Sequence, residues 1–401
     1  MKKTVSLALV LTLLWGNAHA AIRNFTGFET GDAEESASTS GTVSVQATTV
    51  RTGVYALRTN PATTGSGFHD YRAHSTNGGV ANINAATLYL RFYFRYATKA
   101  AANDEVIFDT FGAARKLEVR LNSSGNLVLY DNLLGLLATG TAVLNANTWY
   151  LIELVAGTGT TASIEVKVDG VSDISTTGDT TTTNHHRVRL GKVANRNGNS
   201  VDYFFDDVVY DDAALPDANA AVQVMQADSD GAYTAWTIGA GGAINDWEAV
   251  DELPSDGAIT YLLSTLVIND ATTVGLESAA SAGISGTVNS VKPFITHQRD
   301  GAANGTIKLR TRSGGTDSDA ATFNPLAGVG THCIVHNTDP TDAAAWTLSK
   351  LDALEYGGVE GETTDRSRWQ CGGVMVLYTP GAEAPAAAPA RLQRPRVWIR
   401  R

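Results

Sequence analysis

Residues 88–96 have the sequence LYLRFYFRY, in which every second side chain is large and apolar. Successive side chains of a β-strand point to opposite faces, so this run buries one face of a sheet and turns the other outward. The same period of two recurs in KLEVRLN at 116–122, and further short apolar runs end at Gly, Asn or Asp. Strands at short intervals with turn residues between them predict an antiparallel β-sandwich.

The composition extends this prediction to the whole chain. Its 401 residues include 39 glycines, and only the extreme N-terminus carries a long apolar run, so we expect two or three domains built from short strands. Strand patterns stop at the polar segment 211–220 and then resume. We therefore expect an all-β protein of two consecutive antiparallel β-sandwiches of the jelly-roll type, with one short helix around Leu348, Leu351 and Leu354.

The two ends differ from the rest of the chain. Residues 1–20, MKKTVSLALVLTLLWGNAHA, have the layout of a secretory signal peptide, and their apolar run is too short to span a bilayer. An uncleaved segment that packs on a partner is the alternative. Residues 381–401 form a Pro/Ala linker followed by five arginines, and we expect a disordered tail, or one that docks on an acidic neighbour or anionic surface. The location expected is a virion or the extracellular space.

Several motifs of the first half resemble one known family. They are FTGFETGD, VRTGVYALR, NTWYLIEL, VKVDG and DYFFDDVVY, in this order. Residues 21–213 thereby resemble the concanavalin A/laminin-G type of jelly roll. The resemblance implies a structural calcium held by Glu29 and Asp206, with backbone oxygens from the turn 51–53. The alternative is that Asp206 and its neighbour Asp207 only end the final strand.

The second half, residues 217–380, carries VDELPSDG and later DPTDAAAWTLSKLDALEYGG. The order of these motifs resembles a domain of bacteriophage virion structural proteins. This resemblance implies a minor capsid, tail or fibre component that assembles with other virion subunits or with itself. No catalytic residue accompanies it, and the signal peptide is a departure from such proteins.

An acidic cluster, NDWEAVDELPSDG at 245–257, raises the question of catalysis. Retaining glycosidases need two carboxyl groups about 5–5.5 Å apart, and Glu248 and Glu252 fall on one face of an extended strand. Val250 stands between them where related glucanases carry an assisting aspartate, and Pro254 interrupts the ladder. A solvated strand end and turn is the simpler interpretation, so we assign no catalytic residue and expect a protein that is not an enzyme.

Two further patterns are weighed in the same way. In HCIVH, His332 and His336 lie about 13 Å apart along a strand, too far for one zinc ion. Cys333 and Cys371 are the two cysteines of the chain, and they either pair or remain separate buried thiols.

The best binding candidate is the outward face of 88–96. Tyrosine rings stack on sugars and guanidinium groups bind their hydroxyl or acidic groups, and the side chains concerned are Tyr89, Arg91, Tyr93 and Arg95. Alternatively, these arginines pair across strands with Lys116, Glu118 and Arg120. The leading hypothesis is a non-enzymatic structural and adhesive phage virion component, and the alternative is a secreted bacterial glycan-binding protein; a glycoside hydrolase or lyase comes third. The net charge of −11 argues against nucleic-acid binding, and no other segment suits a membrane span.

Overall fold

The computed structural model describes residues 22–32, 38–62, 65–74, 80–133, 135–192, 200–215, 217–256, 259–301, 305–324, 328–361 and 365–381. The expected signal peptide and nearly all of the expected tail lie outside these residues. The described chain is almost entirely antiparallel β-structure, which confirms the predicted fold class. None of its helices is long and apolar enough to cross a membrane.

The first domain is a sandwich of two sheets. The eight-stranded sheet has the order β15 (Val171–Gly178), β14 (Ala162–Val168), β13 (Tyr150–Ala156), β8 (Leu88–Thr98), β17 (Asp202–Asp211), β4 (Ala56–Thr59) and β3 (Val43–Gln46), with β1 (Ile22–Thr26) also on β17. The seven-stranded sheet has the order β12 (Leu136–Val143), β11 (Asn126–Tyr130), β10 (Arg115–Leu121), β9 (Glu105–Phe111), β16 (Arg187–Lys192), β5 (Gly67–Tyr71) and β2 (Ser38–Gly41). A small hairpin joins β6 (Ala73–His74) to β7 (Val80–Ala81).

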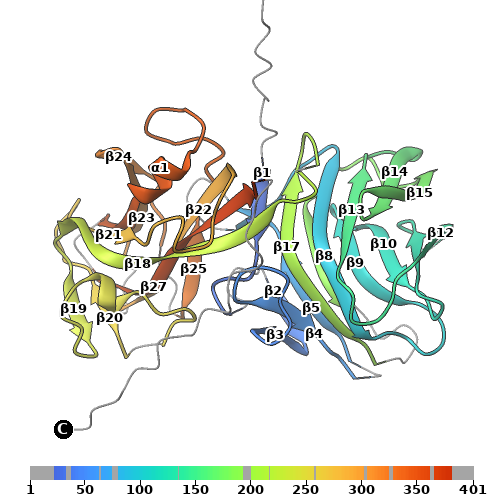
Figure 1. Ribbon diagram of the computed structural model, residues 1–401, viewed down its shortest axis with the longest axis horizontal. Coiled ribbons are helices and arrows are strands. Elements are labelled where there is room, and N and C mark those ends of the chain that lie inside the picture. Colours follow the sequence, from blue (N-terminus) through green and yellow to red (C-terminus); the bar gives the residue numbers. More distant parts are fainter. Residues whose placement is uncertain are drawn as a thin grey trace, which may run out of the picture.

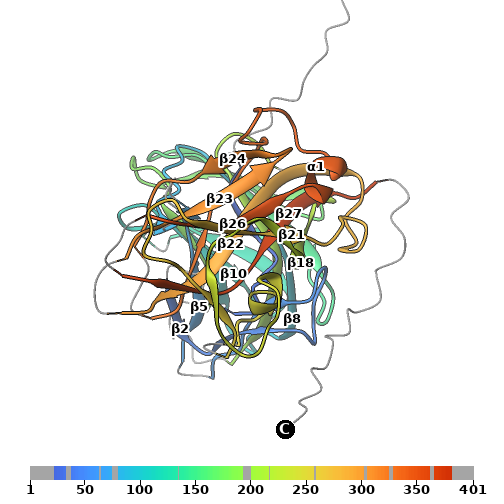
Figure 2. The ribbon, with the colours of Figure 1, turned by 90° about the vertical axis from the view of Figure 1, so that its left-hand side faces the viewer.

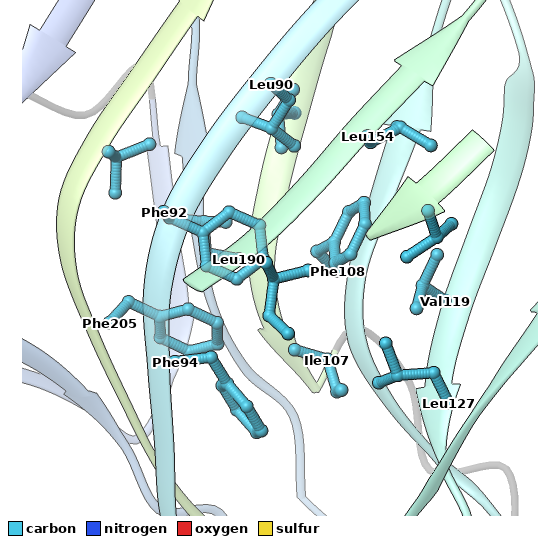
Figure 3. Packing of buried hydrophobic residues seen from close by; sticks show 14 of the residues in the cluster. Leu90, Phe92, Phe94, Ile107, Phe108, Val119, Leu127, Leu154, Leu190 and Phe205 are labelled. Atoms are coloured by element: carbon cyan, nitrogen blue, oxygen red, sulfur yellow. The ribbon is translucent and has the colours of Figure 1, made fainter. Parts of the chain in front are cut away.

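The core of this sandwich follows from the period of two in β8. Its alternate residues Leu88, Leu90, Phe92, Phe94 and Tyr96 are all buried between the sheets, as predicted. Aromatic rings from both sheets meet there: Phe92 contacts Phe108 edge to face at 5.2 Å between centroids (Figure 3). Such contacts add to the free energy gained by removing the rings from water.

The second domain is one ten-stranded sheet folded over itself. The order is β19 (Thr237–Ala240), β20 (Tyr261–Leu263), β27 (Ser367–Thr379), β18 (Ala221–Thr234), β21 (Ala271–Leu276), β26 (Glu355–Glu360), β23 (Ile307–Ser313) and β24 (Thr316–Asp319), while β22 (Thr287–Arg299) joins β27 to β25 (Gly330–Cys333). The long strand β18 pairs with β27 through 221–226 and with β21 through 227–234. Figure 2 shows the strands of this domain from its outer end.

The two halves of the folded sheet enclose a second core. Trp369, from the half that contains β27, is fully buried and meets Tyr356 of β26 at 5.5 Å between ring centroids. A turn of 3₁₀ helix, η1 (Trp247–Ala249), and the short helix α1 (Leu348–Asp352) complete the domain. The Thr347 hydroxyl accepts the Lys350 N–H at 3.2 Å and so caps α1. Leu351 of α1 is buried and Leu348 is half-buried, whereas Leu354, expected on the same helix, is buried just after the helix ends.

A third apolar cluster joins the domains, which lie side by side (Figure 1). Ile22 and Phe25 of β1 pack there against residues of the second domain such as Val222, Phe294 and Met375. Polar contacts accompany this cluster: the buried ammonium group of Lys292 donates to the Phe25 carbonyl oxygen and to Asn24 Oδ1. The two sandwiches therefore share a packed interface.

Candidate functional site

The outward side chains of β8 are not the open face that the sequence suggested. Arg91 is fully buried, and its guanidinium group donates to the backbone oxygens of Asp217 and Ala220 in the interdomain connection. Tyr93 donates its hydroxyl to the Ala218 carbonyl at 3.0 Å and carries the Arg51 guanidinium on its ring at 3.4 Å. The expected exposure of Arg91 is therefore wrong, because the connection to the second domain covers this part of the sheet.

The remaining residues of that face are partly exposed. Tyr89 and Arg95 are both half-buried, and Arg95 donates to Asn147 Oδ1 at 2.9 Å. The alternative pairing with Lys116, Glu118 and Arg120 is wrong, since these residues belong to β10 of the seven-stranded sheet and β8 belongs to the eight-stranded one. Tyr93 is also half-buried, and glycan binding by Tyr89, Tyr93 and Arg95 stays a prediction.

The structure does bring Glu29 and Asp206 together at one loop. Asp206 Oδ2 accepts from the Arg51 N–H at 2.8 Å, and the Glu29 carboxylate accepts from the Val54 N–H at 3.0 Å. Gly53 lies between these donors with φ +67°, and a Cβ there would stand 1.9 Å from Glu29 Oε1. Burial, then the nearby Asp207 and Glu29 carboxylates, hold the pKa of Asp206 well above its usual range.

This donor set fits a calcium ion only with help from the backbone. Ca²⁺ takes six to eight oxygen ligands, and the described residues hold no group of three or more His, Cys, Asp or Glu side chains that suits a metal. Two buried carboxylates of like charge would nevertheless be stabilised by a cation between them. A calcium ion here would take its other oxygens from carbonyl groups or water.

Glu248 and Glu252 of the acidic cluster are held by different hydrogen bonds. Glu248 lies in η1 and accepts the Ile244 and Asn245 N–H groups at 2.8 and 3.1 Å, as a turn residue does. Glu252 accepts instead from the Thr260 hydroxyl at 3.0 Å. The extended strand that would have put both on one face is replaced by a 3₁₀ turn, yet both residues line the same cleft. The absence of enzymatic activity stays a prediction.

The histidines and cysteines occupy separate places in the second domain. His332 contacts His297 and stacks on Phe323, whereas His336 bonds to the Thr311 hydroxyl at 3.1 Å. Cys333 and Cys371 are both buried and are not joined to each other by a disulfide. They lie on strands β25 and β27, on opposite sides of β22, so about two strand spacings of 4.8 Å separate them, beyond the reach of a disulfide.

Charged and aromatic side chains gather on the outward face of the seven-stranded sheet. We name it the arginine face. Four of its residues form one row across four neighbouring strands: Asp70 (β5), Arg189 (β16), Asp109 (β9) and Glu118 (β10). Their chain neighbours, such as Leu190 and Phe108, point into the first core. The row therefore lies on the opposite side of the sheet from that core.

The carboxylates of the arginine face lie beneath guanidinium groups. Arg187 donates to Asp70 at 2.6 Å and Arg115 to Glu118 at 2.7 Å. The Asp70 and Glu118 side chains are at most 1% exposed, whereas those of Arg187 and Arg115 are 29% and 23% exposed. The ion pairs thus hold the arginines in place while part of each arginine side chain reaches the surface.

Guanidinium groups of the arginine face also stack on aromatic rings. Arg189 and Arg187 lie 4.0 and 4.6 Å from the centre of the Phe111 ring, and Arg120 lies 3.9 Å from that of Tyr130. A guanidinium group has five N–H donors, and one carboxylate engages at most two of them. Stacked arginines fixed in this way can offer donors to a carboxylate, a sulfate or a sugar hydroxyl.

Local sequence patterns did not predict the arginine face, because they do not determine the order of strands in a sheet. Arg187 and Arg189 alternate along β16, as do Asp109 and Phe111 along β9, so the period of two was present in both. What the sequence did not show is that β16, β9 and β10 are neighbours in one sheet.

Comparison with known proteins gives only distant matches. No protein-family model matches the chain, and no curated protein matches it. Among solved structures, cellulose induced protein Cip1 is 17% identical over 48% of this chain and 100% of its own, with a TM-score of 0.39. An endo-β-1,4-glucuronan lyase from the fungus Trichoderma reesei is 16% identical over 47% of this chain and 95% of its own, with a TM-score of 0.36.

A third match is a carbohydrate esterase of the Shiga toxin-encoding bacteriophage phi24B. It is 15% identical over 48% of this chain and 100% of its own, with a TM-score of 0.32. The structural neighbours are concanavalin A-like jelly-roll proteins.

Proposed function

We propose that the protein is a non-enzymatic adhesive surface protein that binds an anionic glycan on the arginine face. The observation that supports this is the layer of guanidinium groups stacked on Phe111 and Tyr130 above buried carboxylates. Arginine binds carboxylate and sulfate groups through paired hydrogen bonds. A chain of uronic acids or sulfated sugars carries such groups.

A binding role suits the arginine face better than catalysis does. Asp109 is engaged by both Nε and Nη2 of Arg189, and Glu118 by Arg115 and Arg120. Carboxylates held in this way orient the arginines and are poorly placed to exchange protons with a substrate.

The test is retention on an immobilised polyuronate compared with an immobilised neutral glucan. We expect the polyuronate alone to retain the protein, and Arg187→Gln to weaken binding about tenfold, the effect of losing one charge-assisted contact. Asp70 keeps Arg72 as a partner in this variant, so the fold should persist. The matched control is Arg95→Gln, which removes an arginine from the other sheet and should bind like the wild type.

Equal retention of wild type and Arg187→Gln would refute the arginine face as the binding site. If only Arg95→Gln lost binding to the polyuronate, the binding site would lie at β8. Release of fragments from the polysaccharide would contradict the non-enzymatic role.

Assembly in a phage particle is the second candidate. The motif order of residues 217–380 favours it, and apolar side chains are exposed near the edge strands β12 and β15, where Val143 and Val171 are 55% and 70% exposed. Sheet edges with exposed apolar side chains are common contact surfaces. A virion component should copurify with particles, and Val171→Lys should reduce its incorporation.

We also propose that Glu29 and Asp206 hold a structural calcium ion, and that the protein acts outside the cell or on a virion. Their shared loop and buried like charges support the calcium site.

A further inference from the structure

A cleft of about 940 Å³ lies between the two domains. Glu29, Val54 and Tyr55 of the first domain line one side, and β18 with the segment 241–256 lines the other. The Tyr55 hydroxyl donates to the Leu253 carbonyl at 3.0 Å and so ties the two sides together. The cleft is separate from the arginine face, which lies on the seven-stranded sheet.

The charge of the lining is of one sign. Among the described residues that line the cleft there is no Lys, Arg or His, and there are seven carboxylates: Glu29, Asp228, Glu248, Asp251, Glu252, Asp256 and Glu277. Like charges around a concave, weakly polarisable surface focus a potential that attracts cations. The occupant should therefore carry several positive charges.

Apolar side chains in the same cleft show that the occupant is more than a simple cation. Tyr55, Trp247 and Pro254 contribute to the walls. Ile244, also in the lining, is 84% exposed. Water-exposed apolar groups of this kind favour a ligand that brings its own apolar side chains. A basic peptide with aromatic and aliphatic residues meets both requirements.

The chain itself contains such a peptide. Residues 391–401 read RLQRPRVWIRR, with five arginines around Val397, Trp398 and Ile399. We propose that this segment binds in the interdomain cleft of its own chain. The arginines would face the carboxylates, and Trp398 would meet the apolar walls.

The chain between the end of β27 and residue 391 is long enough to reach the cleft. Tyr378, near the end of β27, pairs with Ala221 at the start of β18, and Gln226 of β18 lines the cleft. Five residues of strand cover about 17 Å, while residues 382–391 extend to roughly 33 Å. The extended length of residues 382–391 therefore exceeds the distance along β18 to the cleft, so Arg391 can reach it.

Limited trypsin digestion of the full-length protein tests the proposal. Intact-protein mass spectrometry measures the rate of cleavage before Leu392 and before Val397. Bound arginines are protected from trypsin. In about 0.02 M salt, which leaves charge attraction almost unscreened, we therefore expect the wild type to be cleaved about tenfold more slowly than the double variant Asp228→Asn/Glu248→Gln. In about 0.5 M salt the two proteins should converge. Asn and Gln keep the hydrogen-bond acceptors, and an unchanged melting temperature verifies the fold.

The matched control is Asp131→Asn/Glu165→Gln, which removes the same two charges from β14 and a turn of the first domain. It should be cleaved like the wild type at both salt concentrations. Equal cleavage of wild type and cleft variant in dilute salt would overturn the proposal. So would protection that disappears on hundredfold dilution of the protein, because the segment would then occupy another copy.

Discussion

Arg189 and Asp109 stand directly opposite each other on β16 and β9 and form a bidentate ion pair, with Nε to Oδ1 at 2.9 Å and Nη2 to Oδ2 at 2.5 Å. The Asp109 carboxylate is fully buried, and this burial raises its pKa to about 6 even with the arginine beside it. The pair lies at the centre of the arginine face. Its two members are separated by 80 residues of chain.

Removing one partner of this pair should destabilise the protein strongly. Arg189→Met leaves the Asp109 carboxylate buried without its main counter-charge, so we expect the free energy of unfolding to fall by about 3–5 kcal/mol. The double variant Arg189→Met/Asp109→Leu removes both charges and should recover most of this loss. Urea unfolding of the three proteins gives the comparison, and equal losses in the single and double variants would contradict the expectation.

Gly53→Ala should be far more damaging than Gly170→Ala. Both glycines have positive φ, +67° and +78°, but a Cβ at Gly53 would collide with Glu29 Oε1 at 1.9 Å whereas nothing lies within 4 Å of one at Gly170. Positive φ alone costs about 1–2 kcal/mol for alanine, and the collision adds roughly 2 kcal/mol or more. Thermal melts of the two variants measure the difference, and similar melting temperatures would argue against the close approach of Glu29.

His69 should make stability depend on pH. It is fully buried against Phe28 and Tyr71, and burial lowers its pKa from 6.5 to about 3. Because the folded-state pKa is lowered, His69 binds a proton more readily in the unfolded chain than in the folded one. The resulting loss in the free energy of unfolding is absent above pH 6.5 and grows as the pH falls. Relative to His69→Phe, the wild type should lose about 1.4 kcal/mol per pH unit between pH 6.5 and 3. A difference that stays constant over this range would show that His69 does not titrate as described.

Calcium removal should lower the melting temperature of the wild type. A cation between Glu29 and Asp206 offsets the repulsion between their two buried carboxylates. Removing the cation with a chelator restores that repulsion. Asp206→Asn removes one charge and should make the melt insensitive to the chelator. Identical melts of the wild type with calcium and with chelator would eliminate the calcium site.

The sequence by itself determined the kind of structure and the composition of its cores. The alternation from Leu88 to Tyr96 was sufficient to predict the five side chains that pack between the sheets, because apolar groups on one face of a strand are removed from water together. It also predicted the short helix at Leu351. The proximity of Glu29 to Asp206 came instead from the resemblance to the concanavalin A/laminin-G jelly roll, and the calcium ion that the resemblance implies stays a prediction.

Only the tertiary structure decided which polar side chains act together. Arg91 and Arg187 have the same alternating context, yet Arg91 is covered by the interdomain connection and Arg187 lies on the arginine face. The physical reason is that hydrogen bonds between strands join residues far apart in the chain. A period of two fixes the face of a strand, but not its neighbours or what packs over it.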